Sequence, residues 1–499
     1  MEFTEPVSLS VLLAIVPEIG LTILALIVLT IDMTTPEERR GGIGLVAAVG
    51  VAVILVANLL LGGPRASDLE GQLVLGGMLR HDTLALIFRT MVLLAGALTC
   101  LISVGLEKVG RQGEYYVIIL VATLGMSLMS AAADLIMVYL GLETTSISLY
   151  VLAGFIRDDE RSSESGLKYF LFGAFTSSIM LYGLSLLYGF AGQTNIYALA
   201  GPLAERLSEG AQGTFALILS LVLIIVGFGF KVAAVPFHFW TPDVYQGAPT
   251  PITAFISTAS KAASFALLLR VFLAVFPSAM QPQWTALVAA MAAATMTLGN
   301  VLALPQRNIK RLLAYSSIAQ AGYALIGVVA ISDLGAAAVT FYMFMYVLTN
   351  IGAFTVIVLF SRATGSEDIA DYAGLSRRSP YLALALVVAL LSLAGIPPLA
   401  GFMGKFYLFS AAVQANMVWL AIVGVLNAIV ALYYYLTVIK IMYVDSSDDD
   451  SPIQVPRAHA FTLVVTSVGV LLMGTIPSVP WFEWAVTAAS GLGLPGVMN

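Results

Sequence analysis

The feature that most constrains this chain is a series of long apolar runs that recurs along its whole length. Of the 499 residues, 59% are hydrophobic and only 10% are charged. A helix needs about 20 apolar residues to cross a hydrocarbon core of about 30 Å. Because the runs are continuous and do not alternate with polar residues, they exclude a transmembrane barrel and predict helices. The expected segments are 7–31, 42–63, 83–106, 115–132, 134–156, 167–190, 213–239, 250–276, 284–304, 312–331, 335–361, 380–411, 416–444 and 460–486. The chain is therefore predicted to be an all-α polytopic membrane protein with about fourteen transmembrane helices.

Several classes of function are excluded by residues that the chain lacks. With Cys100 as its one cysteine, the chain cannot form an internal disulfide framework or a thiolate metal site. It also has no glycine-rich phosphate loop, no histidine pair at metal-ligand spacing and no basic patch for nucleic acid. The first run is long and follows two glutamates without Lys or Arg, unlike a cleaved signal peptide. We expect no metal, cofactor or nucleic acid in this chain, and a lipid bilayer around it.

Lys and Arg are unevenly divided between the two sets of loops. Loops that follow even-numbered segments hold only Arg65, Arg80 and Arg206, whereas the other basic loop residues follow odd-numbered segments. The positive-inside rule then places both termini on the non-cytoplasmic side. The acidic run from Asp445 to Ser451 is interpreted as a solvated turn.

Prolines predict a break in the seventh and in the twelfth segment. Pro236 interrupts the seventh segment, and Gly395-Ile-Pro397-Pro398 interrupts the twelfth. Proline removes a backbone donor and clashes with the preceding turn, and such irregular backbone survives at membrane depth only where protein or a water-filled cavity covers it. Because the breaks lie five helix positions apart, an odd number, they predict two inverted repeats, as in many secondary transporters. The expected units are 1–113 (helices 1–3), 114–276 (first repeat, helices 4–8), 277–444 (second repeat, helices 9–13) and 445–499 (helix 14).

Ionisable residues inside apolar runs are the candidates for function. A charge at the bilayer centre costs about 2.5–3.5 kcal/mol on insertion scales, so such residues need a reason to be there. Burial disfavours the charged form of a lysine and a nearby carboxylate favours it, so a lysine under both influences can exchange a proton, which arginine cannot. The alternatives are structural ion pairs and lysines that extend to the interface. The candidates for a proton relay are Glu143, Lys231, His238, Lys261 and Lys405, with Lys168 at the start of its helix.

Two ionisable residues, His238 and Glu18, also have a structural interpretation. His238 lies seven residues after Lys231 and could either carry a proton or satisfy the free carbonyls around Pro236. Glu18, after Pro17 in the first segment, is more simply an acid at a kink near the outer surface.

Three motifs resemble the antiporter-like membrane subunits of proton-pumping NADH:quinone oxidoreductase, complex I, and subunit N in particular. They are Lys231-x4-Pro236-Phe-His238-x-Trp240-Thr-Pro-Asp243-Val-Tyr-x-Gly-Ala-Pro-Thr-Pro251, Gly166-Leu-Lys168-Tyr-Phe-Leu-x-Gly-Ala and Gly395-Ile-Pro-Pro-x-x-Gly-Phe-x-Gly-Lys405-Phe. The resemblance covers nearly the whole chain.

The resemblance implies a role for each candidate residue. Glu143 would pair with Lys231 and tune it, and His238 would bridge onward. Lys261 would be the central proton-carrying lysine and Lys405 the residue that leads to the exit side. The last candidate, Lys168, matches a further lysine of the family.

The resemblance also implies the setting: a bacterial inner membrane, antiporter-like subunit M and the small membrane subunits as neighbours, and a peripheral redox arm. NADH or ferredoxin, FMN, iron–sulfur clusters and quinone would bind to those partners. The sequence departs from the subunit N pattern at Ser260, where many subunit N sequences have proline and the photosynthetic, ferredoxin-using relatives have serine. This residue leaves the electron donor open. The alternatives are an Mrp-like cation/proton antiporter without redox coupling and a structural scaffold with fixed ion pairs.

Overall fold

The computed structural model describes residues 9–63, 70–208, 210–447, 449, 451–475 and 478–492. The start of the first expected segment, Arg65 of the charge count, Asp448 and Asp450 of the acidic run, and the last seven residues of the fourth unit lie outside these described residues.

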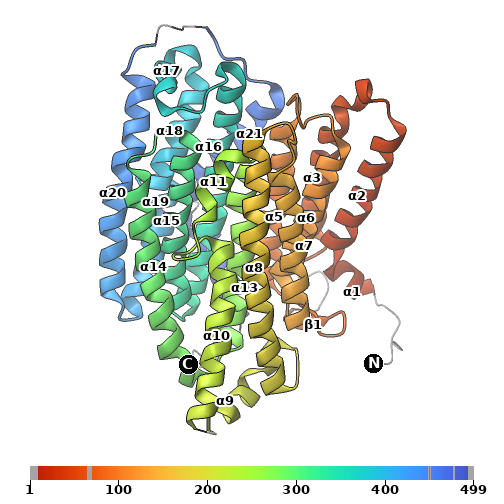
Figure 1. The fold of residues 1–499 in the computed structure, drawn as a ribbon, viewed down its shortest axis with the longest axis vertical. Helices are drawn as coiled ribbons and strands as arrows, with labels where there is room; N and C mark the ends of the chain where they lie inside the picture. The colour runs from red at the N-terminus through yellow and green to blue at the C-terminus, as the bar shows by residue number, and fades with distance from the viewer. Residues whose placement is uncertain are drawn as a thin grey trace.

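Long helices run side by side through the described part of the chain (Figure 1). Thirteen of them are long and apolar enough to cross a membrane. The helices and strands are α1 (Leu9–Ala14), α2 (Val16–Thr34), η1 (Glu37–Gly42), α3 (Ile43–Leu60), β1 (Gln72–Val74), β2 (Leu79–His81), α5 (Thr83–Ser103), α6 (Gly113–Ala131), α7 (Leu135–Ala153), α8 (Glu160–Ala191), η2 (Ile196–Ala198), α9 (Ala200–Ser208), α10 (Ala211–Val232), α11 (Trp240–Gly247), α12 (Thr250–Phe255), the π-helix η3 (Ile256–Ser260), α13 (Lys261–Ala274), η4 (Ser278–Met280), α14 (Gln281–Ala303), α15 (Ile309–Val329), α16 (Asp333–Thr364), η5 (Ile369–Tyr372), α17 (Leu375–Arg378), α18 (Pro380–Ala394), α19 (Ala400–Gln414), α20 (Val418–Tyr443), α21 (Arg457–Gly474) and α22 (Ser478–Ser490). The prediction of an all-α polytopic membrane protein is confirmed.

Polar caps explain where several helices begin. The Asp82 side chain accepts a hydrogen bond from Ala85 N at the start of α5, and Asp134 accepts one from Ile136 N at the start of α7. Such caps satisfy backbone donors that the first turn leaves free. Asp159 caps α8 in the same way, so this helix begins at Glu160, earlier than the expected 167. The apolar run alone marked only the part of α8 that the bilayer covers.

Both predicted breaks are present. The helix α10 ends at Val232 and α11 begins at Trp240, with Pro236 between them. In the other, α18 ends at Ala394 and α19 begins at Ala400, after Gly395 has taken a left-handed φ of 87° that suits glycine.

One local expectation needs correction. The last expected segment, 460–486, is not one helix, because α21 ends at Gly474 and α22 begins at Ser478. A side chain at Gly474 would meet the backbone of Pro398 at 2.2 Å, so α21 ends in close contact with the second helix break. The segment between the second and third expected helices contains the antiparallel hairpin of β1 and β2.

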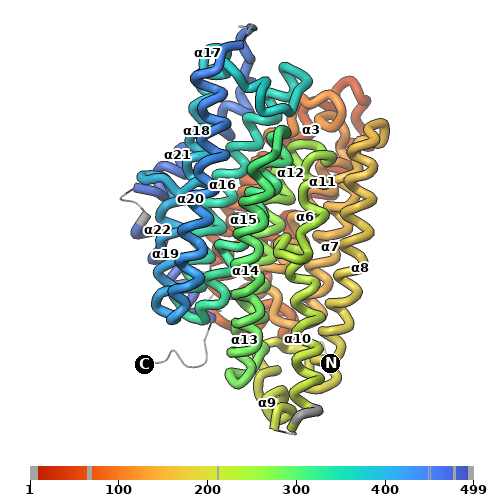
Figure 2. The backbone as a smooth tube through the Cα atoms, turned by 60° about the vertical axis from the view of Figure 1, so that its left-hand side comes forward, coloured from red at the N-terminus to blue at the C-terminus, as the bar shows by residue number. Residues whose placement is uncertain are grey.

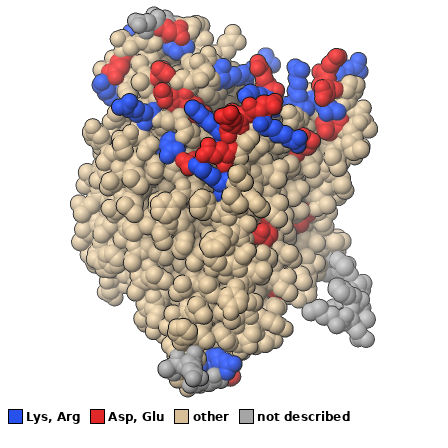
Figure 3. Space-filling model, in the orientation of Figure 1, with Lys and Arg blue, Asp and Glu red and all other residues tan. Residues whose placement is uncertain are grey.

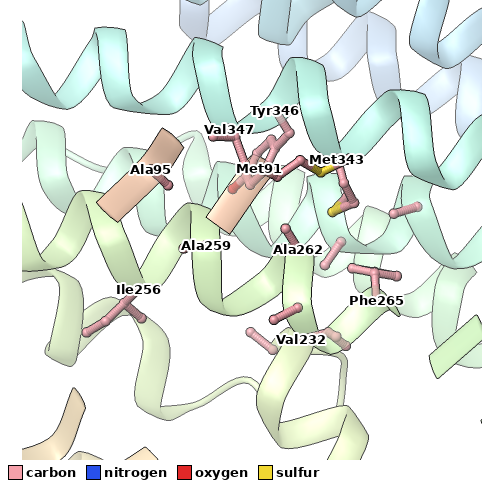
Figure 4. Packing of buried hydrophobic residues seen from close by; sticks show 14 of the residues in the cluster. Met91, Ala95, Val232, Ile256, Ala259, Ala262, Phe265, Met343, Tyr346 and Val347 are labelled. Atoms are coloured by element: carbon pink, nitrogen blue, oxygen red, sulfur yellow. The ribbon is translucent and has the colours of Figure 1, made fainter. Parts of the chain in front are cut away.

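The continuous helical segment formed by α12, η3 and α13, which includes Lys261, lies at the centre of the bundle. In the most apolar stretch of Thr250–Ala274 every residue is buried, whereas in that of Val16–Thr34 only 28% of the residues are buried. Figure 4 shows Ala259 and Ala262 packed near Met91 and Tyr346, which belong to α5 and α16. The helix α14 packs against α15, and α15 packs against α19 (Figure 2). A central helix that touches no lipid can carry polar groups that a peripheral helix cannot.

Charged side chains gather at one end of the molecule (Figure 3). We call this the charged end: the loops between α2 and α3, α5 and α6, α7 and α8, α14 and α15, α16 and α18, and α20 and α21. The short helix α17 lies at this end, whereas α9 and the hairpin lie at the opposite end (Figure 1).

Candidate functional site

Lys261 begins α13 and is 1% exposed. Its Nζ donates to the carbonyl oxygen of Ser317 at 2.7 Å and to the Ser317 Oγ at 2.6 Å. The same Oγ is hydrogen-bonded to the hydroxyls of Tyr346 at 2.7 Å and Tyr245 at 3.0 Å. Within the described residues no carboxylate lies within ion-pair distance of Lys261. Its partners are neutral oxygens, which hold the amine in place without fixing its charge.

The π-helix η3 immediately precedes Lys261. Such single-turn insertions in α-helices are uncommon and frequently occur at functional sites. Ser257, Thr258 and Ser260 of η3 are all at most 1% exposed, so the polar character of this helix begins before the lysine. The break in regularity and the buried amine therefore coincide.

Lys231 lies in the last turn of α10 and is 3% exposed. Its Nζ has no hydrogen-bond partner among the described residues, and it lies 6.0 Å from the ring centroid of Tyr150. Glu143 on α7 acts on it electrostatically. The Glu143 Oε1 is buried and also has no hydrogen bond in the described structure. The structure thus brings the two residues into electrostatic range, without the direct contact that a pair would have.

His238 lies in the break between α10 and α11 and is 4% exposed. Its Nδ1 has no hydrogen-bond partner in the part of the chain that is described. His238 has a hydrogen bond to the Pro236 backbone. Other side chains serve the rest of the break: Trp240 Nε1 donates to Phe230 O at 3.1 Å, and Val235 N donates to Thr295 Oγ1 at 2.9 Å. At Phe230, the carbonyl-satisfying role considered for His238 belongs to Trp240.

The second break holds Lys405, which is 5% exposed on α19. Its Nζ donates to the carbonyls of Leu393 at 2.8 Å and Ala394 at 3.1 Å. These carbonyls end α18, where the helix leaves acceptors free and carries partial negative charge. The Nζ also lies 4.6 Å from the ring centroid of Tyr323, within cation–π range. The helix break itself therefore builds the site for this lysine.

Lys168 is placed differently from the other candidates. Its side chain is 35% exposed and forms ion pairs with Glu164 at 2.7 Å and Asp243 at 2.6 Å. Asp243 on α11 also pairs with Arg311 of α15 at 2.8 Å. The structure does not bring Lys168 together with the buried lysines; it joins α8, α11 and α15 in a surface ion cluster.

We expect Asp243→Asn to loosen this cluster. Partial burial raises the pKa of Asp243, but hydrogen bonds from Lys168 and Arg311 outweigh it and hold the pKa below its ordinary value. The stability from a carboxylate with a lowered pKa is present above the unfolded pKa of about 3.9 and is lost as pH falls further. Pairs this exposed contribute about 0.2–1 kcal/mol each. The thermal unfolding temperature of the assembled complex in detergent should fall slightly at pH 7 and equal that of the wild type at acid pH. A constant difference across this pH range would contradict the assignment.

Sequence reasoning missed two buried ion pairs. Arg270 on α13 binds both carboxylate oxygens of Asp82, at 2.9 and 2.6 Å. Arg89 pairs with Glu18 at 2.8 Å, and Ser127 donates to the same carboxylate oxygen at 2.7 Å. An arginine in an apolar run signals that a partner exists, but the partners lie too far away in sequence to be identified from spacing.

A cavity of about 660 Å³ opens at the charged end beside the start of α12. Lys310 lies in its wall, is 3% exposed, and pairs with Glu367 at 3.2 Å. Its Nζ also donates to Ala248 O at 3.0 Å. The cavity therefore reaches the loop that leads through η3 to Lys261.

Comparison with known proteins agrees with the fold and with the motifs. The family model for the transmembrane region of NADH:quinone oxidoreductase and Mrp antiporter subunits matches residues 132–431. NADH-quinone oxidoreductase subunit N of Trichlorobacter lovleyi is 46% identical over 470 residues, which cover 93% of this chain and 94% of that protein. The subunit N of Moorella thermoacetica is 45% identical over 481 residues, with 96% and 98% covered.

Solved structures show the same arrangement of helices. A chain of respiratory complex I from Thermus thermophilus with bound aureothin aligns with a TM-score of 0.77 and 33% identity, covering 94% of this chain and 99% of that one. A chain of the Mrp complex from Dietzia aligns with a TM-score of 0.85, 98% coverage of both chains and 22% identity, which shows a shared fold alone. By its motifs, its fold and its identity to these relatives, the chain belongs to the antiporter-like family of NADH-quinone oxidoreductase subunit N.

Proposed function

We propose that this protein is a proton-translocating membrane subunit of a complex I-type oxidoreductase. The single observation that supports this most strongly is the row of buried amines, in which Lys231, Lys261 and Lys405 are each at most 5% exposed. None of the three forms an ion pair within the described residues. Fixed ion pairs, the basis of the scaffold alternative, are therefore present elsewhere in the molecule but not at these lysines.

In the proposed mechanism, protons move from the cytoplasm to the outer side. A signal from neighbouring subunits changes the interaction of Glu143 with Lys231. A proton then passes through His238 and water to Lys261, and Lys405 releases it. The cavity beside α12 gives water access from the charged end. Lys168, which lies outside the cavity lining and contacts Asp243, is a further residue of the proposed relay.

The proposal includes an orientation and a division of the chain. The charged end faces the cytoplasm of a bacterial inner membrane, which leaves both termini on the outer side. Residues 114–276 and 277–444 are the two inverted repeats, each with one broken helix. Residues 1–113 precede the repeats and residues 445–499 follow them.

Redox chemistry belongs to the partners. The peripheral arm would carry FMN and iron–sulfur clusters and reduce quinone, while subunit M and the small membrane subunits would adjoin this chain. The curated relatives are named for NADH, which favours NADH over ferredoxin as the donor that Ser260 left open.

Purification in mild detergent at native expression tests the proposal against an Mrp-like antiporter. We expect the protein to copurify with redox subunits, and the complex in proteoliposomes to acidify the lumen when NADH and quinone are supplied from outside. Copurification with membrane subunits alone, together with exchange of sodium for protons without electron flow, would establish the antiporter instead.

A further inference from the structure

Two groups of hydrogen bonds lie between Lys261 and Lys405, and each ends on a serine of α15. The first, which we call the Lys261 group, consists of Lys261, Ser317, Tyr245 and Tyr346. All three partners meet at the Ser317 Oγ, at distances of 2.6 to 3.0 Å. Because a serine hydroxyl both donates and accepts, Ser317 is the natural recipient of a proton from Lys261.

The second, the Lys405 group, consists of Ser316, Tyr435, Gln320 and Lys405. The hydroxyls of Ser316 and Tyr435 lie 2.5 Å apart. Gln320 Nε2 donates to the Tyr435 hydroxyl at 3.3 Å and to Leu393 O at 3.1 Å, and that carbonyl also accepts from Lys405 at 2.8 Å. The hydroxyl of Tyr342 donates to Gln320 Oε1, so the amide is held at both ends.

The two groups are adjacent but separate. Ser316 and Ser317 are consecutive residues and each is 1% exposed, yet no side-chain hydrogen bond joins them in the described structure. Buried polar groups are costly unless hydrogen-bonded, and packing alone does not require a line of them between two lysines. Side chains of consecutive helical residues do not face each other, so a proton that crosses between the two hydroxyls needs a bridging water molecule.

We propose that protons pass from the Lys261 group to the Lys405 group at the Ser316–Ser317 step, with Tyr435 as a proton carrier and Gln320 as its positioning residue. This rests on the proposed function and names the residues that perform its central step. The Lys261 ammonium gives a proton to the Ser317 oxygen as the Ser317 hydroxyl releases its own through a bridging water to Ser316. Ser316 likewise passes one to Tyr435, which releases one through water to the Lys405 amine. Each hydroxyl keeps one proton; Lys261 loses one and Lys405 gains one.

The test compares matched hydroxyl pairs in the assembled complex. Ser316→Ala and Tyr435→Phe remove oxygens from the proposed path. Ser103→Ala and Tyr115→Phe are the controls, because these residues form an equally buried Ser–Tyr pair at 3.1 Å, away from the lysines. We expect the path variants to lower NADH-driven proton translocation in proteoliposomes by about tenfold or more, toward the range for loss of a positioned proton-transfer group. The controls should translocate protons as the wild type does.

A double variant separates positioning from structural support. Gln320→Leu should slow translocation, and adding it to Tyr435→Phe should cause no further loss, because both act on one proton transfer. Additive losses would contradict the role of Gln320.

The failure of this inference is distinguishable from that of the proposed function. If Lys261→Met and Lys405→Met stop translocation while Ser316→Ala and Tyr435→Phe match their controls, the path is wrong and the function stands. Normal translocation in both lysine variants overturns the function and the path together. Should Tyr435→Phe fail to assemble, Ser316→Ala decides alone.

Discussion

Replacing Lys261 with Met is expected to stop proton translocation through this subunit while the complex still assembles. Methionine fills much of the volume of the lysine stem but has no proton to exchange, and Lys261 has no carboxylate partner within the described residues that would be left unpaired. The proton-transfer step should slow by about 10²–10⁴-fold, the range for a positioned acid–base group. NADH-driven lumen acidification in proteoliposomes, measured together with quinone reduction, gives the proton-to-electron ratio.

Two substitutions at the same position serve as controls. Lys261→Arg keeps a positive charge but cannot release it, so it should fail as Met does. Lys261→His restores a group that titrates near neutral pH and should recover part of the translocation. Normal electron transfer with a normal proton-to-electron ratio in Lys261→Met would refute the role of this lysine.

Replacing Asp82 with Asn is expected to destabilise the folded protein strongly. Arg270 is fully buried. Within the described residues its hydrogen bonds other than those to Asp82 go only to Ser130 O at 3.0 Å and the Tyr197 hydroxyl at 2.7 Å. Removing one member of a buried pair typically costs about 3–5 kcal/mol because the other charge is left uncompensated. Asparagine remains a good cap for α5, so the loss reports on the charge. Thermal unfolding and the yield of assembled complex are the measurements.

The double variant Asp82→Asn with Arg270→Met gives the matched comparison. Because it removes both charges, it should recover much of the stability that Asp82→Asn alone loses. Arg80 also lies near this carboxylate, with its Nε 3.4 Å from Asp82 Oδ2. An unchanged unfolding temperature in Asp82→Asn would contradict the prediction, because it would show that neither arginine needs the Asp82 charge.

Much of the fold could be predicted because membrane insertion leaves few alternatives. Continuous apolar runs predict helices, and the prolines at 236 and 397–398 mark the two breaks, because both signals act locally along the chain. The start of α8 and the division of 460–486 were wrong in detail. The first depends on the Asp159 cap in water beyond the apolar run, and the second on the close approach of Gly474 to Pro398.

The candidate site was predicted only as a set of residues. Lys231, Lys261 and Lys405 stand out in sequence because each is charged within an apolar run. Their partners do not stand out. Ser317, the partner of Lys261, lies far from it in sequence, and Leu393 binds Lys405 through a backbone carbonyl that every residue has. Lys168 was a candidate at the start of its helix and through the family resemblance, and its partner Asp243 likewise does not stand out in sequence.

The sequence by itself determined that the chain crosses a membrane many times, where two of its helices break, and which ionisable side chains must lie in a low-dielectric interior. These properties follow from hydropathy and backbone chemistry, which depend on neighbours along the chain. Only the tertiary structure decided which lysines lack a counter-charge, which arginines are paired, and that the hydroxyls of Ser316, Ser317 and Tyr435 lie between Lys261 and Lys405. Those facts depend on distances between helices, because hydrogen bonds and ion pairs act over a few ångströms in space whatever the separation in sequence.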